Sequence, residues 1–353
     1  MSGMWRDLYH GETHFDFVGK RRRWFTISAV LVTISILALL LRGLNLGVDF
    51  VGGSLVEVEN PSGVSVGRVR DALDGLGLEQ SVVQTTGGGA IRVQTEELTP
   101  EEEDRLVEVL TEVAGVDEVL ERRSVGPTFG EQVAESAVRA LVIFLAVVAV
   151  FISWRLEWRM AVAALVALGH DLLLTSGIYA LVGFQVSPAT VIAILTIMGY
   201  SLYDTVVVFD KVLENINERG ERHTVSAIVN MSMNQVFMRS VNTSLTSLLP
   251  IGSLLFVGSY LLGAATLREF ALALFIGVAT GTYSSIFLAA PLLAAWKERE
   301  ETWRRVRRRL ARKGLEDDEY AAHGLAAEPE PEVAVALGSG AAPRAPKKRR
   351  KSR

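Results

Sequence analysis

The feature that most constrains this chain is a series of long apolar runs that contain almost no charge. A run of about 20 apolar residues crosses the roughly 30 Å hydrocarbon core of a bilayer as one helix. The first run covers 24–41 and directly follows four basic residues at 20–23. Later runs cover 140–154, 160–182, 188–209, 240–267 and 270–296. The sequence therefore predicts a polytopic α-helical membrane protein with six transmembrane helices.

The first run resembles a signal peptide only in its basic flank. Its apolar stretch is longer than a signal sequence needs, and Arg42-Gly43-Leu44-Asn45 follows it where a small-x-small cleavage site would stand. We therefore expect residues 24–42 to form an uncleaved first helix. Residues 135–296 then hold helices 2–6.

Basic residues orient the predicted helices. Cytoplasmic loops of membrane proteins carry an excess of Lys and Arg. The cluster at 20–23 places the N-terminal segment 1–23 in the cytoplasm, and six crossings put Arg155, Arg159, the 211–238 segment and the C-terminal tail on the same side. The outer loops 183–187 and 258–266 carry no Lys or Arg, and Arg268 beside Glu269 is the exception. The sequence predicts that both termini are cytoplasmic.

Residues 43–134 hold no apolar run and predict a soluble domain between helices 1 and 2. The segment is acidic, with about eighteen Asp or Glu against six Arg. The pattern predicts a strand at 54–59, a helix at 64–76 and a hairpin at 81–95 around Gly87–Gly89. A helix at 99–114 and a strand at 117–123 follow. The predicted order is therefore β-α-β-β-α-β. This order predicts a ferredoxin-like α+β domain on the extracytoplasmic side.

The tail 297–353 is charged at first and then rich in Ala, Pro and Glu. Its last forty residues have the composition of a disordered segment. It ends in a basic run at 347–351, which we expect to lie near anionic membrane lipid; ribosomal RNA is the less favoured alternative. No specific nucleic-acid partner is predicted.

Three polar positions fall inside the predicted membrane helices. His170-Asp171 lies about halfway along the third helix, Asp204 lies in the fourth and Arg239 opens the fifth. Charged groups in a bilayer are costly and usually face a bundle interior or a water path. A carboxylate that approaches and leaves an arginine can load and release a proton. The competing interpretation is structural: Asp204 joins helices, Arg239 reaches the interface, and His170-Asp171 is a supporting hydrogen-bonded pair.

The sixth helix carries small residues at small-x-x-x-small spacing, namely Gly277, Gly281, Ser284 and Ser285. Small residues let helix backbones approach closely, so a packing role is favoured. The chain has no cysteine, and its five histidines are scattered among different segments. The sequence contains no nucleophile–base pair, phosphate loop or metal-ligand cluster, so it predicts no enzyme, metal or bound cofactor. Protons are the expected coupling ion.

Five motifs in order along the chain resemble the SecD/SecF family of bacterial protein-export membrane proteins, within the resistance-nodulation-division superfamily. They are Gly47-Val48-Asp49-Phe50-Val51-Gly52-Gly53-Ser54, GHDLLLTSGIYAL at 169–181, GYSLYDTVVVFD at 199–210, RSVNTSLTSLLP at 239–250 and ALFIGVATGTYSSIFLAAPLL at 273–293. The resemblance covers about residues 15–295. The tail after residue 300 lies beyond it.

The resemblance implies a function. Members pair with SecD, associate with the SecYEG channel and use the proton-motive force to promote preprotein translocation across the plasma membrane after the SecA ATPase step. Asp204 matches the family's proton-linked aspartate and Arg239 its arginine partner, while Tyr203 stands where many members have Asn. Gly47, Asp49, Phe50, Gly52 and Gly53 match the family's start of the outer domain. The alternatives are a transporter of a small molecule or lipid with the same helices, and a scaffold that only stabilises its partner.

The depth of Asp204 follows from helix geometry. A helix rises about 1.5 Å per residue, so Asp204 lies about 24 Å along the fourth helix from Pro188. This distance predicts a position in the cytoplasmic half of the membrane.

Overall fold

The computed structural model describes residues 15–86, 89–117, 119–220, 222–258 and 265–312. Within these residues, six helices are long and apolar enough to cross a membrane, as the sequence predicted. They are α2 (Arg21–Arg42), α6 (Pro127–Arg155), α7 (Trp158–Val182), α8 (Pro188–Arg219), α9 (Val225–Ser253) with η1 (Leu254–Gly258), and α10 (Ala265–Ser284), which continues through η2 (Ser285–Ala289) and α11 (Ala290–Lys297).

Several helix ends differ from the expected bounds. The second span, α6, begins at Pro127 rather than at 135, because Gly126 is extended and Pro127 occupies the first helical turn. The missed residues 127–134 contain Pro127, Gly130 and Glu131 and no apolar run, so a hydropathy pattern does not detect them. Helices α8 and α9 also extend through most of the 211–238 segment. The predicted outer loop at 259–264, the N-terminal residues 1–14 and the tail 313–353 lie outside the described residues.

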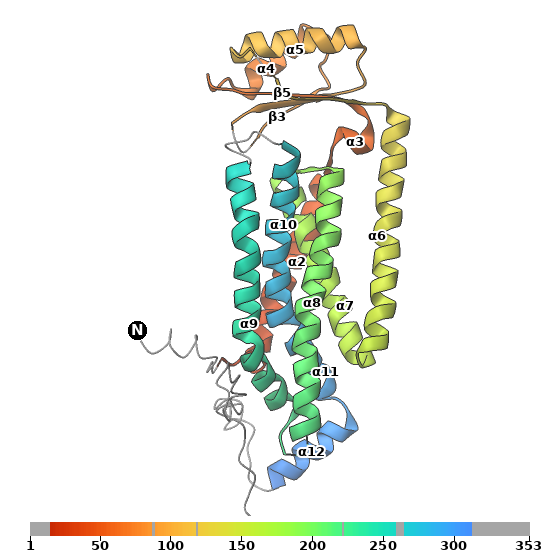
Figure 1. Cartoon of the computed structure of the whole chain (residues 1–353), viewed down its shortest axis with the longest axis vertical. Coiled ribbons are helices and arrows are strands. Elements are labelled where there is room, and N and C mark those ends of the chain that lie inside the picture. The colour runs from red at the N-terminus through yellow and green to blue at the C-terminus, as the bar shows by residue number, and fades with distance from the viewer. Residues whose placement is uncertain (1–14, 87–88, 118, 221, 259–264, 313–353) are drawn as a thin grey trace, which may run out of the picture.

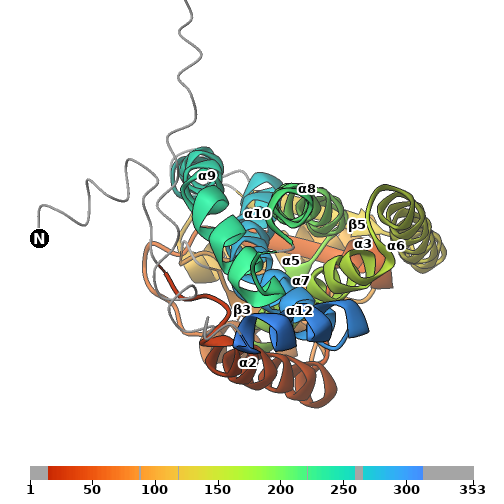
Figure 2. The same cartoon turned by 90° about the horizontal axis from the view of Figure 1, so that it is seen from below.

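Helix α10 is the centre of the helical bundle, with α7, α8 and α9 around it (Figures 1 and 2). Its Gly277 and Gly281 face α8, where an added methyl group would collide with Ile197 and Ser201. By contrast, α6 lies at the edge of the bundle, and only 6% of its most apolar 18-residue stretch is buried. The described bundle is thus compact around α10 and open along α6.

Residues 53–125, between α2 and α6, have the predicted order β-α-β-β-α-β. Four antiparallel strands pair in the order β3-β4-β2-β5, and two helices cover one face (Figure 1). Thr99 caps the second helix through a capping box with Glu102. Gly87 and Gly88 of the predicted hairpin turn lie outside the described residues. The elements are β2 (Gly53–Val58), α4 (Val66–Asp74), β3 (Val82–Thr85), β4 (Ile91–Thr95), α5 (Pro100–Ala114) and β5 (Val119–Val125).

The two faces of this sheet meet different surroundings. Val56, Val58 and Val93 form an apolar core with α4 and α5. The alternate residues Glu57 and Arg92 point the other way and reach groups on the membrane helices. All six residues of β2 are buried for this reason. The sheet therefore lies between its own helices and the ends of the membrane bundle.

Short elements connect the sheet to the bundle. Strand β1 (Asn45–Leu46) pairs in parallel with β6 (Gln185–Val186), which lies between α7 and α8. Helix α3 (Val48–Val51) follows β1 and packs on α6. At the far end of the bundle, α12 (Glu301–Arg312) carries six arginines and places Trp303 close to Gly220.

Candidate functional site

Asp204 lies on α8 with only 8% of its surface exposed. Its Oδ1 accepts a hydrogen bond of 2.7 Å from the Ser240 hydroxyl of α9. Its Oδ2 is buried and has no hydrogen-bond partner among the described residues. A buried carboxylate oxygen without a donor is costly when the group is ionised, whereas a proton on that oxygen removes much of the cost. The geometry at Asp204 therefore suits a group that takes up and releases a proton.

Arg239 lies next to Ser240 on α9 but does not touch Asp204. Its guanidinium donates to the Tyr203 hydroxyl at 3.0 Å, and no ion pair links it to Asp204 in the described part of the chain. The Arg239 side chain is exposed on the surface of the bundle. The two residues that the sequence singled out are thus neighbours across α8 and α9, with the arginine held outside the carboxylate pocket.

His170 and Asp171 are both buried on α7, and Asp171 connects three helices. The Oδ2 atom of Asp171 accepts hydrogen bonds from Ser201 of α8 at 2.6 Å and from Ser284 of α10 at 2.7 Å. Its Oδ1 lies 3.2 Å from His170 Nδ1, and the His170 ring stacks on Tyr283. His170 Nε2 is buried without a partner among the described residues. The structure therefore gives Asp171 a full set of contacts that Asp204 lacks.

Hydroxyl groups from α8, α9 and α10 lie near the Asp171 and Asp204 carboxylates. Ser201 precedes Asp204 by three residues, so the two lie on one face of α8. On the other side of Asp204, the Ser244 hydroxyl donates to the Ser240 backbone carbonyl at 2.7 Å and lies 2.7 Å from the Thr282 hydroxyl of α10. Helix α10 thus contacts the network around each carboxylate.

The small residues of the sixth span contribute both close packing and hydrogen bonds. Gly277 and Gly281 bring α10 against α8, in agreement with a packing role. Ser284 instead binds Asp171, and the Ser285 hydroxyl contacts Thr205 at 2.9 Å. Ser285 also opens the π-helical turn η2, a distortion that often occurs at functional sites.

The glycine-rich segment at 47–53 forms the joint between α2, the sheet and α6. Gly47 donates its backbone N–H to Val186 at 2.8 Å, and Asp49 pairs with Arg123 at 2.7 Å. Phe50 is buried against the membrane helices. Gly52 and Gly53 have φ values of 79° and 114°, which other residues adopt only with strain. Each residue of the motif therefore shapes this joint.

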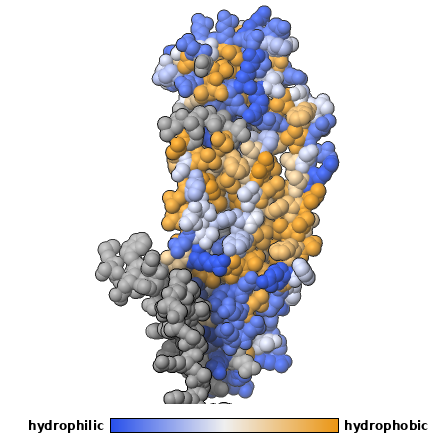
Figure 3. Space-filling view, in the orientation of Figure 1, coloured by the Kyte–Doolittle hydropathy of each residue, from blue (hydrophilic) through white to orange (hydrophobic). Residues whose placement is uncertain are grey.

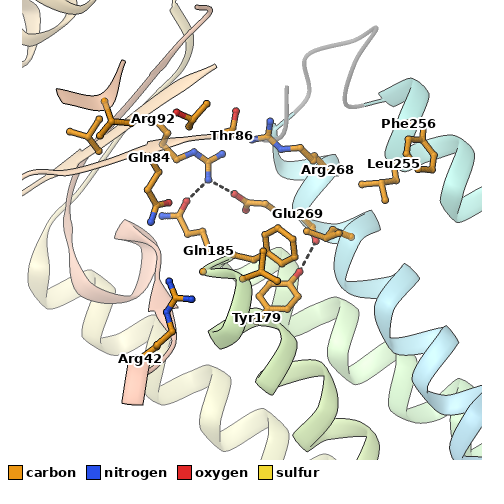
Figure 4. A pocket seen from close by; sticks show the side chains of 17 residues that line it. Arg42, Gln84, Thr86, Arg92, Tyr179, Gln185, Leu255, Phe256, Arg268 and Glu269 are labelled. Carbon is orange, nitrogen blue, oxygen red and sulfur yellow. Dashed lines mark hydrogen bonds and ion pairs between the residues drawn. The ribbon is translucent and has the colours of Figure 1, made fainter. Parts of the chain in front are cut away.

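A second charged cluster, which the sequence did not reveal, lies where the sheet meets α10 (Figure 4). We call it the junction cluster: Glu57 and Arg92 of the sheet, Gln185 of β6, and Arg268 and Glu269 of α10. Arg92 binds Glu57 at 2.7 Å and Glu269 at 2.8 Å, and it also donates to Gln185. Arg268 contacts Glu57 at 3.2 Å. Burial alone would lower the pKa of Arg92, but Glu57 and Glu269 outweigh it and raise that pKa above its usual value.

The junction cluster borders a cavity of about 660 Å³. Arg42, Tyr179 and Phe256 line it along with members of the cluster (Figure 4). Glu121 lies behind the cluster, 3.8 Å from Arg92, and burial raises the pKa of its carboxyl group although Arg123 and Arg92 oppose the shift. The described residues contain no group of three His, Cys, Asp or Glu side chains that could hold a metal ion.

Comparison with known proteins decides the family. The sequence model described as "Protein export membrane protein SecD/SecF, C-terminal" matches residues 106–299, and that of the "SecD/SecF GG Motif" matches residues 37–59. The chain belongs to the SecD/SecF family. The GG motif match contains Gly47–Gly53, and the C-terminal match contains Asp171, Asp204 and Arg239.

Relatives in the SecD/SecF family align with most of the chain. "Protein translocase subunit SecF" of Streptomyces coelicolor is 41% identical over 324 residues, covering 91% of this chain and 86% of that protein. The protein of the same name from Mycobacterium tuberculosis is 42% identical over 320 residues, covering 87% of this chain and 72% of that protein. "Protein translocase subunit SecDF" of Thermus thermophilus is 35% identical over 299 residues, covering 82% of this chain and 40% of the SecDF chain.

A solved SecD/SecF family structure has the same fold. The crystal structure of Thermus SecDF, described as a translocon-associated membrane protein, superposes with a TM-score of 0.74 at 34% identity. The superposition covers 82% of this chain and 39% of the SecDF chain. The chain therefore corresponds to less than half of that longer protein.

Proposed function

We propose that this chain is the SecF-type subunit of a protein translocase. Together with SecD it uses the proton-motive force to promote preprotein translocation across the bacterial plasma membrane after the SecA ATPase step. The observation that carries the proposal is Asp204, a buried intramembrane carboxylate with one unsatisfied oxygen, in a member of the SecD/SecF family. The relatives named above are translocase subunits, which does not favour the alternative of a small-molecule or lipid transporter.

In the proposed mechanism, Asp204 is the proton-carrying residue. Protonation of the free Oδ2 removes the cost of a buried charge, and Arg239 stabilises the ionised form when α9 brings it close. One proton that crosses a potential of roughly 150 mV supplies about 3.5 kcal/mol. That energy biases a two-state equilibrium by several hundred-fold, which is enough to drive a conformational change.

The proposal places the sheet and its helices outside the cytoplasm as a ferredoxin-like domain. The strand order β3-β4-β2-β5 within a β-α-β-β-α-β chain supports this fold. Basic residues at 20–23 and on α12 support cytoplasmic termini. In this orientation the domain faces the side on which a preprotein emerges.

SecD is the proposed partner in the membrane, and it covers a polar stripe on α8 and α9. Pale and blue atoms interrupt the orange surface over these helices in Figure 3. The stripe consists of the exposed residues Thr196, Tyr203, Arg239, Asn242 and Thr246. Polar groups are costly against lipid, so a partner helix with complementary groups stabilises them. SecDF of Thermus, in which a longer chain includes the region matched here, supports a SecD-like partner.

The remaining proposed partners follow from the relatives' role as translocase subunits. They are the SecYEG channel, SecA in the preceding step, and preproteins, which the outer domain meets as they leave the channel. Co-purification tests the SecD proposal: the chain is expected to elute with SecD in one complex, and Arg239→Leu is expected to weaken that complex. A chain that purifies alone when SecD is co-expressed contradicts the proposed pairing.

Replacement of Asp204 tests the proton role. We expect Asp204→Asn to fail to restore preprotein export in cells depleted of the native protein. Asp210→Asn is the matched control, because Asp210 lies on the same helix but is 41% exposed and pairs with Arg155. Export restored in full by Asp204→Asn would refute the proton role.

A further inference from the structure

The junction cluster is a buried polar contact between two parts of the molecule that are far apart in sequence. Arg92 and Glu57 come from facing positions on β4 and β2, whereas Arg268 and Glu269 come from the first two turns of α10. The side chains of Glu57 and Arg92 are only 1% and 6% exposed, and those of Glu269 and Arg268 are 14% and 17% exposed. Water therefore screens these charges little.

Such a cluster fixes geometry more strictly than apolar packing does. A guanidinium is planar, and Arg92 uses its Nε for Glu57 and its NH1 for Glu269, so the two carboxylates must keep fixed positions around it. A buried charge that loses its partner is costly. The cavity beside the cluster means that apolar groups do not fill this part of the junction. These charged side chains therefore bind the sheet to α10.

Further along its length the same helix contacts the Asp171 carboxylate directly and a serine of α9 one turn from Ser240, the residue that binds Asp204. Ser284 donates to Asp171, and Thr282 reaches the Ser244 hydroxyl of the network that holds Asp204. The fifteen-residue step from Glu269 to Ser284 corresponds to about 22 Å of helix. Between these points Gly277 and Gly281 hold α10 directly on α8, the helix that carries Asp204. One continuous helix thus joins the junction cluster to Asp171 and to the serines of α9 beside Asp204.

We propose that Arg92 and Glu269 are positioning residues that couple the outer domain to the protonation state of the intramembrane carboxylates through α10. This inference rests on the proposed function, because it assumes that protonation moves the membrane helices. A small shift of α10 that follows protonation is transmitted to the sheet through the Arg92–Glu269 and Arg268–Glu57 contacts, and both are needed. The domain then follows the helix as part of one body.

The test uses Glu269→Gln in the full chain co-expressed with SecD. Three quantities are measured: preprotein export in depleted cells, the pH dependence of Asp204 labelling by a hydrophobic carbodiimide, and labelling of a cysteine introduced at Leu120 with and without the proton gradient. The chain has no native cysteine, and Leu120 is 38% exposed on β5, so labelling at this site reports on the domain alone.

The proposal predicts that Glu269→Gln lowers export at least tenfold. Asp204 labelling keeps its pH midpoint, but the Leu120→Cys labelling rate no longer changes when the gradient collapses. Arg122→Gln is the matched control, because it removes ion pairs to Glu103 and Asp104 within the domain and leaves α10 untouched. This control is expected to keep export and the gradient response within twofold of wild type.

Arg268→Gln is a second, independent variant of the junction, so that the conclusion does not depend on Glu269→Gln folding correctly. It removes the other contact across the junction, at 3.2 Å from Glu57, and leaves Arg92 paired with Glu57. It is expected to lose export and the gradient response in the same way, with unchanged Asp204 labelling. Wild-type export in both variants, a domain response that persists, or a shifted Asp204 midpoint would overturn the coupling role. Failure of the proposed function is distinguishable, since Asp204→Asn would then export normally.

Discussion

Replacement of Gly277 by alanine tests the close contact of α10 with α8 quantitatively. A Cβ at this position would lie 2.6 Å from Ile197 Cγ2 and 2.7 Å from Ile197 Cγ1, with Cδ1 nearer still. Favourable carbon–carbon contacts are about 3.5–4.0 Å, so Ile197 or the whole of α10 must move by roughly 1 Å. Ile197 is only 3% exposed and has little free space. Overpacking of this kind costs about 1–3 kcal/mol.

The control for this prediction is Gly199→Ala on α8. No atom lies within 4 Å of the Cβ that it introduces, so it changes helix propensity alone. Gly→Ala favours a helix interior by about 1 kcal/mol, and this gain is common to both variants. The difference in unfolding free energy between Gly277→Ala and Gly199→Ala is therefore expected to be about 1–3 kcal/mol, as overpacking requires. Unfolding of the purified proteins by titration with SDS measures it. Equal stability of the two variants would refute the contact.

Three further predictions concern packing and capping. Gly177→Ala is expected to separate α2 from α7 and lower the melting temperature, because the new Cβ would lie 2.6 Å from the backbone Cα of Ser35; Gly169→Ala, with no atom within 4 Å, should not. Thr99→Ala removes the cap of α5 and should cost about 1 kcal/mol, measured as faster hydrogen exchange in that helix. Bonds from the Thr99 backbone N–H and hydroxyl lower the pKa of Glu102, so the stability that Glu102 contributes is present above its unfolded-state pKa and is lost as the pH falls through its folded-state pKa; the protection factors of the α5 amides, which correct for the intrinsic exchange rate, should fall over that range.

Much of the architecture could be predicted from the sequence, because each feature had a local signal. Uncharged runs located the six spans, and alternating residues with turn glycines gave the order of the elements between the first and second spans. The start of α6 at 127–134 was missed because this stretch carries Pro127, Gly130 and Glu131, residues that are usual in a loop. Local hydropathy does not distinguish such a helix from a loop.

The junction cluster could not be predicted, because its members are distant in sequence. The alternation in β2 placed Glu57 opposite the apolar core, which is the position of an ordinary solvent-facing residue. Only the docking of the sheet on the membrane helices makes that face buried. Arg268 was the one exception to the charge pattern of the predicted outer loops, and its contact with Glu57 gives the physical reason.

Asp204 and Arg239 were found from their cost in a membrane, but their geometry was not evident. The sequence suggested a pair, whereas the structure places Ser240 on the carboxylate and Tyr203 on the arginine. Tyr203 thus holds Arg239 on the lateral surface of the bundle. Helix spacing does not predict which residue of α9 contacts Asp204, because Arg239 and Ser240 are adjacent in the sequence.

The central claim is that Asp204 carries the protons that drive this subunit. Proton uptake by proteoliposomes that contain the chain with SecD measures it directly, with a pH-sensitive dye inside the vesicles and an imposed proton gradient. Wild type and Asp210→Asn are expected to take up protons at similar rates, and Asp204→Asn is expected to fall to the rate of vesicles without protein. Proton uptake by Asp204→Asn at the wild-type rate would contradict the account.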